Sequence, residues 1–249
     1  MSTNYQEKVK RMHSSSWVGY WPLDEERGTT VFNAVKPSQQ PITTTPEQNG
    51  TSANLVRTGA ARSFLAPDGG KCARFDGSTT YIDMVSALSS SAISPGTMAA
   101  WAAIPQENLT GTTKMTLWYF AVDGNNVLTY EFDTTANRFM VVHVGGSTSK
   151  TSTTSLVYNE NAGAIHPQWH HYAMTYTSGG SLAAYIDGVA QTAATSLGTF
   201  AGTFNTANMC LGSDSTTISD PFNGWMSHFL WSNAVFSADD IKELATIGP

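Results

Sequence analysis

Charge is scarce in this sequence, and positive charge is scarcer than negative. Charged residues make up 13% of the 249 residues, about half the share found in an average globular protein. The formal net charge at pH 7 is −6, whereas nucleic-acid binding generally needs a basic face. No apolar run is long enough to cross a membrane. These absences argue against nucleic-acid binding and against membrane insertion.

An apolar leader is also missing at the start of the sequence. Residues 1–17 hold no apolar stretch of the kind that forms a secretory signal peptide. We therefore expect an extracellular or virion-surface protein that is exported without a classical signal. Before assembly we expect it to be cytoplasmic.

Cysteine is rare as well. Cys72 and Cys210 are the two cysteines, and each lies in a predicted strand. Our interpretation is that both are buried as small apolar side chains. A disulfide would need the two strands to be neighbours, which the sequence leaves open.

The strongest pattern that is present is a β-hairpin at residues 165–190. Residues 169–176 and 182–189 alternate in polarity around a short turn that contains Gly179 and Gly180. Asp187-Gly188 marks a further turn. His170 and His171 are consecutive in the first strand, so their side chains should point to opposite faces and should not bind one metal ion together.

Short alternating segments between turn signals occur along most of the chain. Hydrophobic residues make up 41% of the sequence, enough for a sizeable core, and all-β sandwiches of this length are often single domains. Two segments are predicted loops without a strand pattern: residues 33–66, rich in Thr, Pro, Gln and Ala, and residues 147–164, rich in Ser and Thr. The other predicted strands are residues 17–24, two within 71–84, 97–104, 115–122, 126–133, 138–144, 209–213 and 222–231.

The two ends of the chain have helical patterns of different strength. Ser237 and Asp240 form a capping-box pattern, which predicts a short C-terminal helix. Residues 1–16 are polar, and two helical turns there would be marginal in isolation. We predict an N-terminal arm over 1–16 that anchors a protein partner or a second copy, followed by a single domain over 17–249.

Taken in order, these segments resemble the LamG-like jelly rolls of the concanavalin A-like lectin/glucanase superfamily. The matching segments are YWPLDE (20–25), RFDGSTTYIDM (74–84), TMAAWAAI (97–104), WHHYAMTYTSGGSLAAYIDGV (169–189), LGSD (211–214) and PFNGWMSHFLWSNAVFSADDIKEL (221–244). The resemblance implies an all-β fold: a two-sheet antiparallel jelly-roll sandwich of roughly six or seven strands. It carries a short N-terminal arm and a short C-terminal helix.

The resemblance also implies two kinds of binding. Aromatic rings on a lectin-like sheet can stack on sugars, which makes Trp118, Tyr119 and Trp231 candidate ligand-binding residues. LamG-like modules often carry calcium at a loop edge, where carboxylates and carbonyls supply oxygen ligands. The candidate calcium ligands, at the ends of the matching segments, are Asp24, Asp76, Asp83 and Asp214.

A glucanase activity is the weakest of the functions that the resemblance raises. The related β-glucanases carry Glu-x-Asp-x-x-Glu on one strand, because hydrolysis needs paired carboxylates. Here the segment starts with Glu131 and Asp133 and places Ala136 where the second Glu belongs. We therefore predict no catalytic residues.

We predict a non-catalytic lectin-like recognition or display module. It would be a structural surface component, such as a decoration, fibre or tail protein of a phage or other virus particle, with a glycan as its ligand. The alternative is a free-standing calcium-dependent carbohydrate-binding protein, and a glucanase-type glycoside hydrolase comes third.

Overall fold

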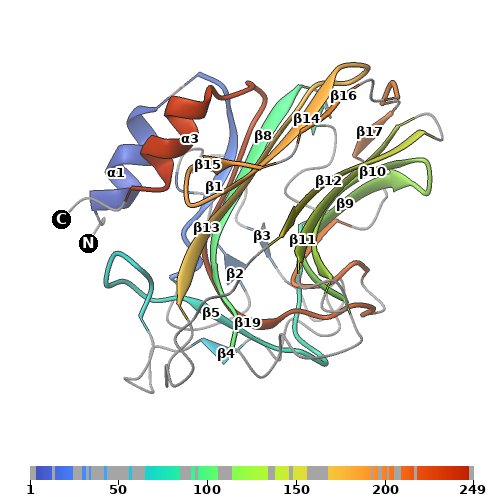
Figure 1. The fold of residues 1–249 in the computed structure, drawn as a ribbon. Helices are drawn as coiled ribbons and strands as arrows, with labels where there is room; N and C mark the ends of the chain where they lie inside the picture. Colours follow the sequence, from blue (N-terminus) through green and yellow to red (C-terminus); the bar gives the residue numbers. More distant parts are fainter. Residues whose placement is uncertain are drawn as a thin grey trace.

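A computed structural model of the chain shows two antiparallel β-sheets packed face to face, with two short helices against the outside of one sheet (Figure 1). This confirms the predicted jelly-roll sandwich. The structure describes residues 4–12, 15–24, 30–31, 34, 42–43, 56–57, 65–84, 91–92, 95–105, 114–133, 138–145, 148–155, 168–191, 193–195, 198–200, 202–204, 209–215 and 218–246.

Among these residues the larger sheet has nine strands. Across it lie β15 (Val189–Ala190), β14 (Ser181–Ile186), β13 (Trp169–Tyr176), β8 (Gly96–Ala103), β19 (Asn223–Ser232), β5 (Ala73–Asp76) and β4 (Val56–Arg57). Two further strands attach beside this path: β1 (Trp17–Trp21) pairs with β19, and β16 (Ala194–Thr195) pairs with β14.

The described part of the smaller sheet has six strands. In order they are β12 (Thr148–Ser155), β11 (Arg138–Gly145), β10 (Asn126–Asp133), β9 (Lys114–Asp123), β18 (Met209–Leu211) and β6 (Ile82–Asp83). Two short ribbons complete the described strands, β2 (Thr30–Val31) with β3 (Ile42–Thr43) and β7 (Ser91–Ala92) with β17 (Thr203–Phe204).

The sequence located most strands correctly. The central hairpin forms as β13 and β14, with Tyr172 opposite Ile186 and Tyr176 opposite Leu182. Asp187 has φ 51° and Gly188 has φ 77°, the left-handed conformation that a tight Asp-Gly turn requires. Both loop predictions were wrong in part, because β3 and β4 lie within 33–66 and β12 lies within 147–164.

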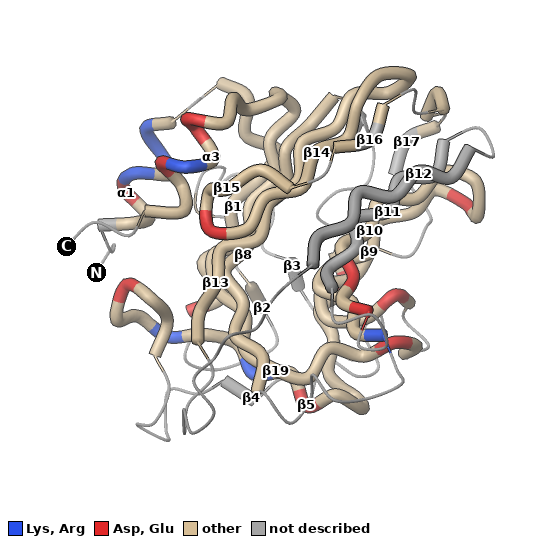
Figure 2. The backbone as a smooth tube through the Cα atoms, in the orientation of Figure 1, with Lys and Arg blue, Asp and Glu red and all other residues tan. Residues whose placement is uncertain are grey.

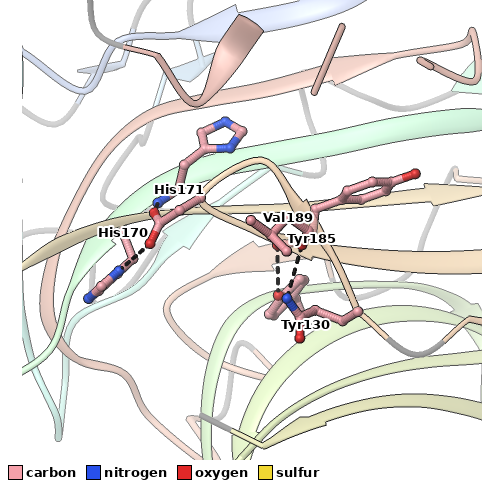
Figure 3. Close-up of polar contacts among 7 residues, drawn as sticks. Tyr130, His170, His171, Tyr185 and Val189 are labelled. Carbon is pink, nitrogen blue, oxygen red and sulfur yellow. Dashed lines mark hydrogen bonds and ion pairs between the residues drawn. The ribbon is translucent and has the colours of Figure 1, made fainter. Parts of the chain in front are cut away.

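Aromatic side chains fill the space between the sheets. Trp118 and Phe120 of the six-stranded sheet each lie 5.8 Å, centroid to centroid, from Phe229 of the nine-stranded sheet. Tyr130 crosses the sandwich, and its hydroxyl donates to the Tyr185 carbonyl at 3.4 Å (Figure 3). Because each of these rings is buried, the inner faces of both sheets are committed to the core.

A second apolar layer lies on the outer face of the nine-stranded sheet, under helices α1 (Asn4–Arg11) and α3 (Ala238–Leu244) (Figure 1). In α3, Ile241 and Leu244 are buried. The predicted capping box is confirmed: Ser237 Oγ accepts from the Asp240 N–H at 3.2 Å, and an Asp240 carboxylate oxygen accepts from the Ser237 N–H at 2.9 Å.

Helix α1 corrects our expectation of an arm. Tyr5 is 2% exposed and Val9 is fully buried, both against the same domain. The Lys8 ammonium donates to the carbonyl oxygens of Glu243 and Thr246 at the end of α3. Tertiary packing therefore stabilises a helix that would be marginal alone. Anchoring of a partner through 1–16 stays a prediction.

Both cysteines are buried, as predicted, and the structure shows no disulfide between them, a question that the sequence had left open. Burial, followed by the negative charges of Asp83 and Asp214, raises the pKa of the Cys210 thiol.

In the part of the chain that the structure describes, no helix has the length and apolar character needed to span a membrane.

A buried polar network lies beneath α1. A bulge in β19 holds His228 at φ 56°. Its ring nitrogens lie 2.7 Å from the Tyr20 hydroxyl and 3.1 Å from Asp68 Oδ2. Tyr5 covers this ring at a centroid distance of 4.6 Å. His171 is also fully buried, and its two ring nitrogens have no hydrogen-bond partner.

We expect Tyr5→Ala to destabilise the protein by about 3 kcal/mol, the usual cost of truncating a buried aromatic side chain. Lys10→Ala, on the exposed side of the same helix, should change the free energy of unfolding by less than about 0.5 kcal/mol. Chemical denaturation measures both. If Tyr5→Ala unfolds like the wild type, α1 is not docked in solution and the arm interpretation is right.

His171 makes stability depend on pH. Burial, opposed by Asp187 and reinforced by His228, lowers its pKa to about 3, whereas the unfolded value is about 6.5. Between these values the unfolded chain binds a proton that the folded chain does not. Stability should therefore fall by about 1.4 kcal/mol per unit as pH drops below 6.5.

The measurement is the free energy of unfolding at several pH values between about 6.5 and 4.5, in the wild type and in His171→Phe. We expect the slope of the free energy of unfolding against pH to be smaller in the variant by about 1.4 kcal/mol per pH unit, which is the contribution of one proton. An unchanged slope would contradict a buried, neutral His171.

Candidate functional site

A β-bulge in β9 decides which of its side chains face outward. The pairing of β9 with β10 shifts register next to the Glu131–Thr116 pair. As a result Leu117 and Trp118 both point into the core. Thr116 and Tyr119 then share the outer face of the six-stranded sheet, although strict alternation would place them on opposite faces.

Polar contacts on this outer face centre on the Glu131 carboxylate. Glu131 is only 8% exposed. One of its oxygens accepts from the Thr129 hydroxyl at 3.1 Å and the other from the Lys114 ammonium at 3.3 Å. Thr129 is also the cross-strand partner of Tyr119. The ring of Tyr119 therefore lies one strand away from a buried, charge-paired carboxylate.

The segment that follows β18 brings two more carboxylates to the same place. The Gly212 N–H donates to the Leu117 carbonyl, and the Thr116 N–H donates to the Asp220 carbonyl, both at 2.9 Å. These bonds hold Asp214 and Asp220 beside the bulge. Asp220 sits at φ 45°, a left-handed conformation that costs about 1–3 kcal/mol and is concentrated at functional sites.

We call the following group of six residues the acidic cluster: Lys114, Thr116, Tyr119, Glu131, Asp214 and Asp220. Two of its atoms are buried without a hydrogen-bond partner: the Thr116 hydroxyl, in a residue with no exposed surface, and Asp214 Oδ1. Native proteins rarely leave such atoms unsatisfied. In Figure 2 acidic residues gather beside a basic one near β9 and β10.

Negative charge dominates the electrostatics of the cluster. Burial, then the charges of Asp214 and Glu131, raise the pKa of Asp220. The same three influences raise the pKa of the Tyr119 hydroxyl. The charge of Glu131 raises the pKa of Lys114 and keeps it protonated. Mutual shifts of this kind are typical of binding and catalytic sites.

The three predicted ligand-binding aromatic residues differ in their exposure to solvent. Trp118 and Trp231 have no exposed surface and belong to the core between the sheets, so neither ring can stack on a ligand from solvent. The indole N–H of Trp231 donates to the Tyr176 hydroxyl at 3.1 Å. Only Tyr119 is partly exposed, and it lies in the acidic cluster.

The four predicted calcium ligands are not gathered into one site. Asp24 accepts from the Gln6 amide at 3.0 Å. Asp76 accepts hydrogen bonds from the Thr79 hydroxyl and from the N–H groups of residues 78, 79 and 80. Partial burial acts to raise the pKa of Asp76, but these hydrogen bonds outweigh it and lower the pKa. Asp83 and Asp214 both lie near Cys210.

No group of three or more His, Cys, Asp or Glu in the described chain is arranged to hold a metal ion. The four aspartates therefore do not fit a shared calcium site. His170 and His171 do point to opposite sides of β13, as Figure 3 shows, with His170 2.6 Å from the Asp187 carboxylate.

Two antiparallel sheets packed face to face define the class of lectin-like jelly rolls. The family model described as "Concanavalin A-like lectin/glucanases superfamily" matches residues 76–242, more than half of the chain. The chain belongs to this superfamily, as its segments suggested. A search of curated protein sequences finds no match.

Solved structures share the fold at low sequence identity. A botulinum neurotoxin serotype D ligand-binding domain in complex with N-acetylneuraminic acid has a TM-score of 0.64 at 10% identity, covering 97% of this chain and 52% of that one. The type G receptor-binding domain has a TM-score of 0.59 at 10% identity, with coverages of 92% and 51%. The chain spans about half the length of these structures.

Sequence analysis found Tyr119 and Asp214 as separate candidates and considered Glu131 only as part of an incomplete glucanase motif. It missed Lys114, Thr116 and Asp220. Lys114 directly precedes the predicted strand 115–122, and Thr116 lies within it as a polar residue among apolar ones. Asp220 follows a stretch without a strand or helix pattern. Alternation of side chains places Glu131 and Thr129 on one face, but it gives no signal for the bulge or for the return of residues 212–220.

We expect Asp214→Asn to lower the pKa of both Asp220 and Tyr119, because it removes one negative charge that raises each of them. Carboxylate NMR titration follows Asp220, and ultraviolet absorbance follows the tyrosine. Asp239→Asn, on the exposed face of α3, is the matched control and should shift neither. An Asp220 titration that is the same in Asp214→Asn and wild type would show that the cluster is not assembled.

Proposed function

We propose that this protein is a non-catalytic carbohydrate-recognition module that binds a glycan on the outer face of its six-stranded sheet, around Tyr119. The observation that carries the proposal is the setting of this ring. It is partly exposed, and hydrogen-bonding groups of β9, β10 and the segment after β18 surround it.

This setting suits the chemistry of a sugar. A pyranose ring has an apolar face, which stacks on an aromatic side chain, and a rim of hydroxyl groups. Glu131 and Asp214 can accept hydrogen bonds from such hydroxyls, and the Thr116 hydroxyl can take either role. A rigid sheet supplies the ring and one carboxylate, which fixes their relative positions before binding.

The comparisons support a binding role in a general way. The similar structures are titled as receptor-binding or ligand-binding domains, and one of them holds a sugar acid. At this identity the likeness shows the fold alone. Display on a phage or other virus particle, calcium dependence and location remain predictions from the sequence.

A glycan array with the full chain tests the proposal. We expect binding to a defined set of saccharides, reduced at least about tenfold by Tyr119→Ala through loss of stacking. Tyr119→Phe should retain most of the affinity, since it keeps the ring. Asp239→Asn should bind like the wild type.

Two results would contradict this proposal. Undiminished binding by a folded Tyr119→Ala variant would place the ligand elsewhere. Release of reducing sugar from a bound glycan, abolished by Glu131→Gln, would favour the glycoside hydrolase alternative.

A further inference from the structure

Charge in the acidic cluster is unbalanced. Among the described residues, Lys114 is paired with Glu131 at 3.3 Å, while Asp214 and Asp220 form no ion pair. Lys114 is the one cation of the cluster against three carboxylates. The site therefore carries excess negative charge where a ligand would contact Tyr119.

The excess charge is partly shielded from water. Asp214 and Asp220 are half-buried, and Glu131 beside them is 8% exposed. In such surroundings the effective dielectric constant is lower, and a nearby ligand charge is felt more strongly than at an open surface. Burial raises the pKa of Asp220 and of the Tyr119 hydroxyl, and the charges of Asp214 and Glu131 raise both further.

Unsatisfied polar atoms point to the ligand's place. The Thr116 hydroxyl lies on the face of Glu131, because its neighbours Met115 and Leu117 belong to the core, and its own N–H is bound to the Asp220 carbonyl. This hydroxyl and Asp214 Oδ1 are both buried without a partner. A ligand with donor groups would satisfy Asp214, and the hydroxyl could pair with a donor or an acceptor.

We propose that the acidic cluster selects its saccharide by charge: it favours sugars with a protonated amine, accepts neutral sugars less well, and rejects acidic sugars. Asp214 and Asp220 are the selecting residues. This inference rests on the proposed function and adds the ligand class. It differs from the solved neighbour in complex with N-acetylneuraminic acid, because an added carboxylate would face the carboxylates of this site.

Two matched pairs of sugars test the selection at about pH 6. Glucosamine oligomers and their N-acetylated counterparts differ in the charge of the amine, and lactose and sialyllactose differ by one acidic sugar. By calorimetry at low salt we expect about tenfold tighter binding of the amine form. Sialyllactose should bind at least several-fold more weakly than lactose.

The double variant Asp214→Asn/Asp220→Asn should bring the amine-to-neutral affinity ratio close to one. Asp239→Asn/Glu243→Gln removes two negative charges from α3, far from the cluster, and should keep the ratio of the wild type. Raising the salt concentration should also reduce the ratio in the wild type, since screening weakens charge interactions. Thermal melting checks that each variant is folded.

The outcomes distinguish this inference from the proposed function. Binding of the sugars without the expected ranking, or a ratio that survives the double substitution and high salt, overturns the charge selection and leaves carbohydrate recognition in place. No binding to any of the four sugars, together with no binding on the array, overturns both.

Discussion

The contact between Trp118 and Phe229 across the core is the constraint on which much else in this structure depends. Each residue lies next to a β-bulge, and each bulge turns its ring inward. Burying Trp118 puts Tyr119 on the outer face of the six-stranded sheet. Burying Phe229 leaves His228 at φ 56° beneath α1. Packing of large rings therefore determines the positions of the polar groups on both outer faces.

The two outer faces have different roles. Helices α1 and α3 cover the outer face of the nine-stranded sheet, so its Tyr20–His228–Asp68 network is enclosed and serves the docking of α1. Neither of the two described helices, α1 and α3, lies on the outer face of the six-stranded sheet (Figure 1). Tyr119 stays partly exposed there, beside carboxylates that repel one another. That difference is why the ligand is assigned to the second face.

Part of the net charge of −6 is concentrated around Tyr119. Few charged residues are available, yet the fold places three carboxylates and one lysine around Tyr119. Assembly of Asp214 and Asp220 against their mutual repulsion has a cost, which the packing of the surrounding core offsets. A site built at such a cost is well suited to discriminate between ligands by charge.

The sequence by itself determined the sandwich, the central hairpin, the capped helix α3 and the burial of both cysteines. The hairpin, the helix cap and the burial of the cysteines follow from local periodicity and turn chemistry, which act over a few residues, whereas the sandwich was implied by the resemblance of the ordered segments to the superfamily. Tertiary structure alone decided that Trp118 and Trp231 are core residues, that residues 4–11 dock as a helix, and that Asp220 joins Glu131. Each of these depends on a register shift or on a contact between distant segments, to which local patterns give no signal.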